Sequence, residues 1–393
     1  MNSTRRNVGL LAACQALLMT NNATLIAING LAGLALAPVK ALATLPVTCW
    51  VAGGALATML ASLHMKRVGR QRGLSIGTLW GIVGAFICAG AVWLQSFWLL
   101  CFGTLVFGVY NAYGQYYRFA AADVAGPDFK STAISLVLAG GLVGGILGPT
   151  TSRVTVDLLT PRFTGAYLAL IGFALVTLLL LRFIRIPTPD AKVQAARGRP
   201  LAEIAAQPKF IVAALASAIG YGVMNFLMTS TPIAMGVCGH PYSDAAFVIS
   251  SHVIGMFAPS FVTGGLIRRI GVLPVMFAGA LLNFAAIGIA LAGISVAQFW
   301  WSLVLLGVGW NFLYIGGTTL LTETYRPEEM AKAQGANDQA IFIVMAISSF
   351  TSGLTVTQAG WERVNLYALP LVALVAIAIG WFALVQRRAR AAA

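Results

Sequence analysis

The chain has 393 residues, of which 59% are hydrophobic and only 9% are charged. Soluble domains carry roughly 25% charged residues, so this composition excludes an ordinary water-soluble fold. The formal charge is +14, but the basic residues are spread over short segments between apolar runs. Nucleic-acid binding needs them clustered on one soluble face. We therefore expect a protein that lies in the lipid bilayer and binds no nucleic acid.

Apolar runs long enough to cross a bilayer recur along the whole sequence. About 20 helical residues cross a hydrocarbon core of ~30 Å, and lipid offers the backbone no other hydrogen-bond partner. The first run is too long for a cleaved signal peptide and is taken as a span. The predicted spans are 8–36, 42–64, 74–95, 97–118, 132–152, 163–184, 209–235, 244–267, 272–294, 297–322, 334–356 and 364–386.

One long polar stretch, 185–208, separates the sixth and seventh spans and contains Pro187, Pro189, Pro200 and Pro208. Its composition indicates a linker. The predicted protein is therefore an all-α membrane protein with twelve transmembrane helices. It has a six-helix bundle at 1–184, a cytoplasmic linker at 185–208 and a second six-helix bundle at 209–393.

The placement of lysine and arginine predicts the orientation, because these residues accumulate on the cytoplasmic side of a membrane. With the N-terminus inside, 21 of the 25 basic residues are cytoplasmic, and the four outside are Lys40, Arg153, Arg162 and Arg363. Both termini are then predicted to be cytoplasmic. The predicted location is a bacterial inner membrane, which the chain crosses many times.

The sequence contains no nucleotide-binding loop, zinc-hydrolase spacing or convincing nucleophile triad. Catalytic chemistry also needs a domain that holds a cofactor or substrate, and the loops between spans are too short to build one. We predict that the chain is not an enzyme and has no resident cofactor.

Two short loops at the same place in each half carry a shared pattern. They are 62–72, which reads SLHMKRVGRQR, and 264–271, which reads GGLIRRIG. Both match in part the G-x-L-x-D-R-x-G-R loop of the major facilitator superfamily, which the chain resembles over its whole length. Lys66 and Arg268 stand where that family has an aspartate, and Ser62 replaces the first glycine. The resemblance implies two bundles that rock about a central substrate site.

A second motif, Gly144-x-x-x-Gly148-Pro149, lies in the fifth span. It resembles the start of a motif found in antiporters of the same superfamily. The same spacing of small residues is typical of close helix packing. The residues alone leave both interpretations open.

Two residue pairs at a spacing of four stand out on consecutive spans. Met224 and Met228 lie in the seventh span, and His252 and Met256 lie in the eighth. That spacing places both members of a pair on one helix face. Counted from the outer turn between the two antiparallel spans, Met228 is as deep as His252, and Met224 is as deep as Met256.

Thioether and imidazole groups at this depth suit copper. Thioether sulfur is a soft neutral ligand for Cu(I), imidazole binds copper well, and neutral ligands avoid the cost of a charge in the membrane. We predict a metal site formed by the four side chains. The alternative is that the methionines are flexible packing residues and the histidine is a satisfied polar group.

The same four residues resemble the CcoA-type copper importers of the major facilitator superfamily, which carry Met-x-x-x-Met in the seventh helix and His-x-x-x-Met in the eighth. This resemblance implies import of copper, as Cu(I) or a complex, into the cytoplasm for assembly of cbb3-type cytochrome oxidase. Copper is then the transported substrate and not a cofactor. The expected partners of the protein are the lipid bilayer and cytoplasmic or membrane copper acceptors.

Two other functions stay open. The chain is alternatively a transporter of an organic solute or drug, in which the methionines form an apolar wall. A third interpretation is a receptor or assembly factor that transports nothing.

Weaker candidates surround the predicted metal site. Met235, Cys238 and His240 lie near the outer turn and are predicted either to pass metal inward or only to face solvent. Met19 in the first span and Asn311 in the tenth are predicted to line the cavity or to pack.

Asp338 enters the eleventh span, where a carboxylate has two possible roles. One is to couple proton movement to transport. The other is structural, through a pair with Arg118 or Lys332 or as a helix cap beside Asn337.

Overall fold

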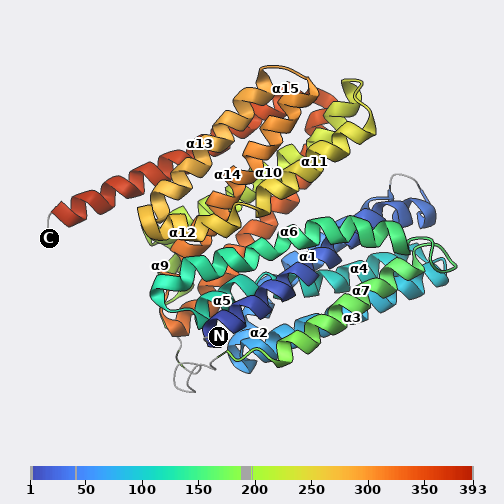
Figure 1. Cartoon of the computed structure of the whole chain (residues 1–393), viewed down its shortest axis with the longest axis horizontal. Helices are drawn as coiled ribbons and strands as arrows, with labels where there is room; N and C mark the ends of the chain where they lie inside the picture. The colour runs from blue at the N-terminus through green and yellow to red at the C-terminus, as the bar shows by residue number, and fades with distance from the viewer. Residues whose placement is uncertain (1–2, 40–41, 187–195, 197, 392–393) are drawn as a thin grey trace. The chain divides into compact units, whose positions relative to one another are not determined.

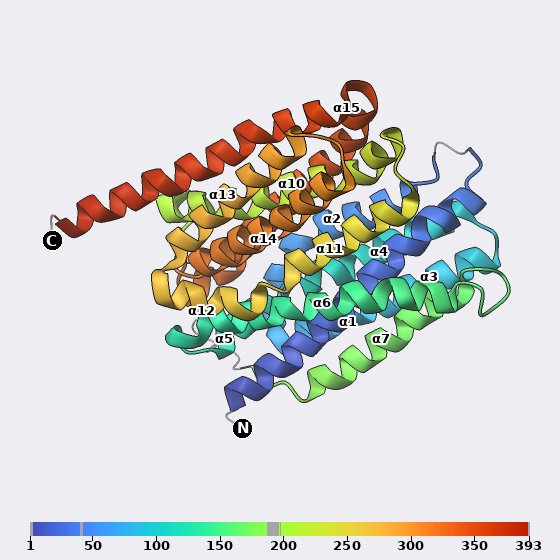
Figure 2. The same ribbon diagram turned by 45° about the horizontal axis from the view of Figure 1, so that its top comes forward.

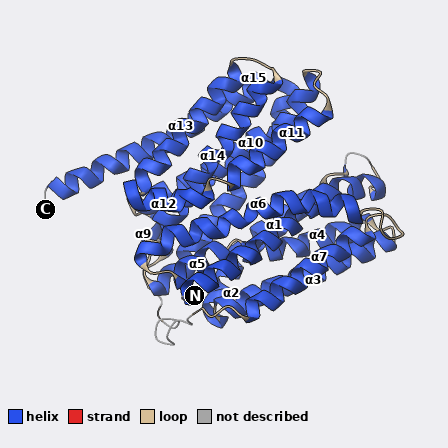
Figure 3. Cartoon of the chain, viewed as in Figure 1, coloured by secondary structure: helices blue, strands red, loops and turns tan. Residues whose placement is uncertain are grey.

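The computed structural model describes the chain except for residues 1–2, 40–41, 187–195, 197 and 392–393. Every regular element in the described part is a helix (Figure 3). The elements are α1 (Ser3–Leu36), α2 (Leu45–Val68), α3 (Arg70–Trp93), α4 (Phe97–Gly114), α5 (Tyr117–Val124), η2 (Pro127–Phe129), α6 (Lys130–Thr155), α7 (Thr164–Arg182), α9 (Leu201–Ala205), α10 (Pro208–Val237), α11 (Tyr242–Phe257), α12 (Ser260–Ile270), α13 (Val272–Leu291), α14 (Val296–Leu321), η3 (Pro327–Glu329) and α15 (Met330–Ala391).

The described part contains 11 helical segments that are long and apolar enough to cross a membrane. The last of them, α15, has 62 residues, and Gly360 interrupts it with φ 80° and ψ 176°. One span needs only about 20 residues, so α15 contains both the eleventh and the twelfth predicted spans. The prediction of an all-α membrane protein with twelve spans is confirmed, whereas the orientation of its termini stays a prediction.

The chain divides into two compact units. Unit 1 comprises 1–127 and 136–196, and within it α4 packs against α2 and α3, while α7 packs against α3 and α1 (Figure 1). Unit 2 comprises 128–135 and 197–393, and within it α10 packs against α14 and α15, while α13 lies beside α14 (Figure 2). Part of the predicted linker, 187–195 and 197, lies outside the described residues.

The two similar loops of the sequence make the same turn in each unit. Gly69 joins α2 to α3 with φ 88°, and Gly271 joins α12 to α13 with φ 91°. A residue with a side chain rarely adopts such positive φ values, so glycine is required at both turns. The repeat seen in the sequence is thus also a structural repeat.

Arg70 forms the charge contact of the first loop. Its Nε donates to Oδ2 of Asp123 in α5 at 2.9 Å, and its guanidinium lies 5.5 Å from the centre of the Tyr116 ring. The loop is therefore tied to the helix that follows α4, although Lys66 occupies the aspartate position of the pattern. The residue after the corresponding glycine in unit 2 is Val272, which carries no charge for such a contact.

The glycines of the fifth-span motif let α6 approach α1 closely. A Cβ on Gly144 would lie 2.7 Å from the backbone N of Thr20, and one on Gly148 would lie 3.1 Å from the carbonyl O of the same residue. Such distances leave no room for a side chain. Of the two interpretations of this motif, the structure supports close helix packing.

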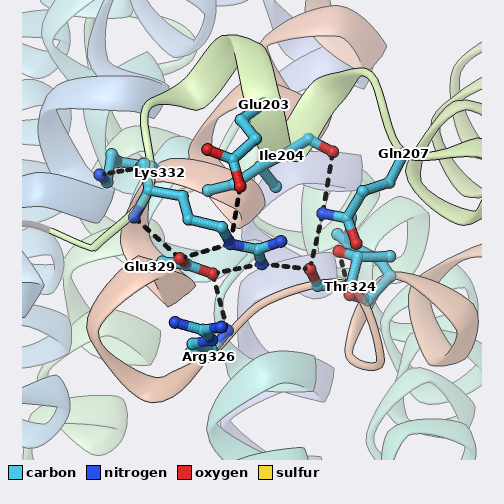
Figure 4. A network of polar contacts seen from close by, with 9 residues as sticks. Glu203, Ile204, Gln207, Thr324, Arg326, Glu329 and Lys332 are labelled. Carbon is cyan, nitrogen blue, oxygen red and sulfur yellow. Dashed lines mark hydrogen bonds and ion pairs between the residues drawn. The ribbon is translucent and has the colours of Figure 1, made fainter.

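The end of the linker is attached to the connection between α14 and α15 (Figure 4). Glu329 is fully buried there and binds the guanidinium of Arg199. Lys332 donates to the carbonyl O of Arg199 at 2.6 Å, and Gln207 donates to the carbonyl O of Thr324 at 3.0 Å. These contacts involve backbone on both sides, so they fix the course of the chain as it enters unit 2.

Candidate functional site

The two predicted metal-binding pairs lie on α10 and α11. Met224, His252 and Met256 are 2%, 0% and 7% exposed, and Met228 is half-buried. Helix α14 packs against both α10 and α11. Side chains of α14 therefore also surround the two predicted pairs.

His252 is oriented against α14. Its Nδ1 lies 2.6 Å from the carbonyl O of Leu303, and because a carbonyl only accepts, the proton is on Nδ1. Gly307 makes this approach possible, since a Cβ there would lie 2.7 Å from the carbonyl O of His252. Among the described residues, Nε2 of this histidine has no hydrogen-bond partner.

A copper site here would depend on sulfur. In the part of the chain that the structure describes, no three His, Cys, Asp or Glu side chains gather as metal ligands. His252 is the one member of the predicted set with a nitrogen ligand, so the other three would contribute thioethers. The role of these four residues as metal ligands stays a prediction.

Four aromatic side chains from α10, α11 and α14 form a cluster beside these residues. The rings of Trp310 and Tyr314 are stacked, with centroids 5.0 Å apart and an interplanar angle of 16°. Tyr221 contacts both edge-on, at 5.4 and 5.6 Å, and Phe257 contacts Trp310 edge-on at 5.7 Å. We call Tyr221, Phe257, Trp310 and Tyr314 the aromatic cluster.

On α10, helical spacing places Tyr221 of the aromatic cluster on the same face as the two methionines. Tyr221, Met224 and Met228 recur at intervals of three and four residues, which is one face of α10. Trp310 and Tyr314 are four residues apart on α14 and so share a face as well. The region is thus mainly apolar and aromatic, as small-molecule sites usually are.

The indole of Trp310 adds one polar group to this apolar region. The side chain is 2% exposed, and among the described residues its Nε1 has no acceptor. A buried N–H without a partner is costly, and it can bond to a water or to a carbonyl of a bound molecule. The cluster therefore combines ring surfaces with a hydrogen-bond donor.

Asn311 makes structural hydrogen bonds, which agrees with the second of its two predicted roles, packing. Its Nδ2 donates to the carbonyl O of Met256 at 2.7 Å and to Oγ of Ser260 at 2.6 Å, and its Oδ1 accepts from Thr263 at 2.7 Å. These bonds cross the break between α11 and α12 and occupy the amide on both sides. Asn311 holds that break and has little capacity left for a substrate.

The residues near the outer turn are also engaged. His240 is bonded through Nε2 to the carbonyl O of Ile294 at 2.7 Å, and its ring lies 5.9 Å from that of Phe299. Met235 is fully buried in α10, and Cys238 is half-buried at the end of that helix. A metal relay through these residues stays a prediction.

The two remaining candidates are Met19 and Asp338. Met19 is half-buried in α1, and its backbone packs against Gly144. Asp338 is buried in α15 and accepts from Nδ2 of Asn337 at 2.9 Å, which agrees with a structural role, and Lys332 donates to the carbonyl O of Arg199. Proton coupling by Asp338 stays a prediction.

Unit 1 contains a cluster of buried amides. Nδ2 of Asn22 and Nε2 of Gln115 both donate to Oδ1 of Asn111, at 2.8 and 3.3 Å. Asn21 is fully buried, and neither atom of its amide has a partner among the described residues. This cluster provides donors and acceptors, and Nη1 of the buried Arg118 donates to Oε1 of Gln115 at 3.2 Å. The sequence does not show that Asn22 in α1 lies against Asn111 in α4.

The family follows from the sequence comparison. The Major Facilitator Superfamily model matches residues 11–349 and, in a second match, 239–393. The chain belongs to this superfamily. It is a membrane transporter by family, and its multi-pass helical fold agrees with a location in the inner membrane.

Two curated relatives and one solved structure are similar along nearly the whole chain. The riboflavin transporter RfnT of Brucella anthropi is 41% identical over 377 residues, covering 95% of this chain and 94% of its own. The MFS-type transporter YddS of Bacillus subtilis is 30% identical over 369 residues, covering 88% and 84%. The transporter FucP, crystallised in the outward conformation, has a TM-score of 0.77 with 18% identity, covering 97% and 99%.

These relatives support the superfamily, but they do not support copper import in particular. The superfamily is as predicted, but the resemblance to CcoA-type importers has no support among them, since the relative with 41% identity is named for riboflavin. The short Met-x-x-x-Met and His-x-x-x-Met patterns use residue types that also serve as ordinary packing in an apolar site.

Proposed function

We propose that the chain transports an organic solute with a planar aromatic ring system, of which riboflavin is the leading candidate. The observation that carries this proposal is the aromatic cluster on three helices of unit 2. Similarity to a riboflavin transporter along 95% of the chain supports the same substrate class. Transport by alternating access, and not catalysis, is the expected activity.

The chemistry of the region fits a flavin. The tricyclic ring of a flavin is flat and polarisable, so it gains from stacked or edge-on contacts with Trp310, Tyr314 and Tyr221, each worth about 0.5–1.5 kcal/mol. Its ring carbonyls accept hydrogen bonds, which the unpartnered N–H of Trp310 can donate. Met224 and Met228 then form apolar wall, as in the alternative prediction from the sequence.

The test is uptake of radiolabelled riboflavin into liposomes that contain only the purified protein. A Trp310→Leu variant removes the central ring of the cluster and is expected to lower uptake at subsaturating substrate by about tenfold or more, because the substrate loses one ring contact and the hydrogen bond from the indole N–H. Trp301→Leu is the matched control, because Trp301 lies on the same helix but is 52% exposed. Equal uptake by both variants and the wild type would refute a role for the cluster.

Copper import is the second candidate, and the unpartnered Nε2 of His252 favours it. Mass-spectrometric copper uptake by the wild type and by His252→Ala and Met228→Ala variants separates the two functions. If the wild type takes up copper saturably, both variants lose that uptake and riboflavin is not taken up, copper is the cargo and not riboflavin. Riboflavin uptake without copper uptake would exclude copper as the cargo.

A further inference from the structure

A cavity of about 390 Å³ lies at the beginning of α1 in unit 1. It is lined by Ser3, Arg6, Asn7 and Arg185. Ligand sites for small molecules start at about 300 Å³, so the cavity is large enough for a phosphate headgroup. None of these residues belongs to the proposed substrate site.

A specific contact builds this basic cavity. Nδ2 of Asn7 donates to the carbonyl O of Arg185 at 2.7 Å, and the backbone N of Arg185 donates back to Oδ1 of Asn7 at 3.3 Å. The asparagine is 5% exposed, so this reciprocal pair is largely shielded from water. It fixes the segment after α7 against the first turns of α1, and it brings together two arginines that are distant in the sequence.

The charge of the basic cavity is not balanced within the described structure. Arg6 and Arg185 take part in none of the ion pairs formed among the described residues. No acidic residue precedes Asp123 in the chain, and α7 contains none. The first backbone N–H groups of α1, a helix of 34 residues, add to the positive potential at this end.

We propose that the basic cavity binds the phosphate of an anionic phospholipid. Arginine holds phosphate through paired N–H groups, and the first turn of a helix offers further N–H donors. Basic cavities at the cytoplasmic ends of transmembrane helices are suited to anionic headgroups, and the distribution of basic residues predicts that this end is cytoplasmic.

Apolar surface beside the cavity favours a lipid over a free anion. Phe183, two residues before Arg185, is 58% exposed, and Leu179, one turn earlier on α7, is 54% exposed. Acyl chains would cover these side chains while the headgroup occupies the basic cavity. A free phosphate would gain nothing from them.

The experiment is native mass spectrometry of the purified full chain titrated with phosphatidylglycerol, and in parallel with phosphatidylcholine and with inorganic phosphate. The test variant carries Arg6→Gln and Arg185→Gln. The control carries Arg387→Gln and Arg388→Gln, two exposed arginines near the end of α15. It loses the same charge at the same predicted side of the membrane.

We expect the wild type and the control to bind phosphatidylglycerol more tightly than phosphatidylcholine, and the test variant to bind it about 30-fold more weakly. A further variant with Arg6→Lys and Arg185→Lys keeps the charge and should recover part of the affinity, which separates charge loss from misfolding. Equal binding by the test variant and the control would overturn the proposal. Tight binding of inorganic phosphate without preference for the lipid would overturn the lipid assignment.

Discussion

Arg199 donates three hydrogen bonds to the carboxylate of Glu329, through its backbone N at 2.9 Å, its Nε at 2.8 Å and its Nη2 at 2.6 Å. The backbone N of Arg326 donates a fourth at 3.0 Å. The two side-chain bonds to Glu329 raise the pKa of Arg199 above its ordinary value, so the guanidinium stays charged. The fully buried carboxylate of Glu329 thus receives hydrogen bonds from Arg199 in the linker and from Arg326 in its own turn.

Glu329→Gln tests this attachment. The amide keeps one acceptor oxygen but turns two N–H donors toward a site that already supplies donors, so we expect the unfolding midpoint in detergent to fall by a few degrees and the linker to become more sensitive to protease. The matched control is Glu323→Gln, whose carboxylate pairs with Lys209 at 2.9 Å but is half exposed. An equal, small effect of both variants would show that the linker is held by other contacts.

Trp310→Phe separates stacking from hydrogen bonding in the aromatic cluster. Phenylalanine keeps a ring against Tyr314 but lacks the indole N–H. If that N–H donates to the substrate, the affinity for riboflavin should fall about fivefold, which is one neutral hydrogen bond, and less than in Trp310→Leu. Binding is measured by quenching of flavin fluorescence. Identical affinities for Trp310→Phe and the wild type would mean that the N–H bonds to water.

Asn311→Leu is expected to destabilise unit 2 by about 2 kcal/mol, because it removes three buried hydrogen bonds at the break between α11 and α12. Asn283→Leu is the contrasting control. Asn283 is equally buried, but neither atom of its amide has a partner among the described residues, so its removal should be neutral or stabilising. Thermal unfolding followed by tryptophan fluorescence compares them, and a reversed order would contradict the role given to Asn311.

Gly144→Leu is expected to lower stability by about 1–3 kcal/mol, because the new side chain would displace α6 from the backbone of Met19 and Thr20. Gly172→Leu in α7 is its control, since a Cβ there meets nothing within 4 Å. Both variants add the same apolar group to a membrane helix. If they unfold at the same temperature, the close approach of α1 and α6 does not contribute to stability.

Much of the fold was predictable from residues that act locally. A bilayer leaves the backbone no partner except its own helix, so the length of each apolar run predicted a span, and the arginine-rich glycine turns marked the same place in each half. Gly360 lies between the last two predicted spans, where the sequence indicated a short break. The spacing of the Met and His pairs likewise predicted that each pair shares a helix face. It did not predict which side chains of other helices lie beside them.

The sequence by itself determined the class of protein, because hydrophobic length and charge placement are properties of each segment alone. Only the tertiary structure decided what those segments do together. It brought Tyr221, Phe257 and Trp310 from three helices into one cluster, and it used the amide of Asn311 to hold a helix break. Side-chain chemistry at a site depends on which helix faces which, and helical spacing within one segment does not contain that information.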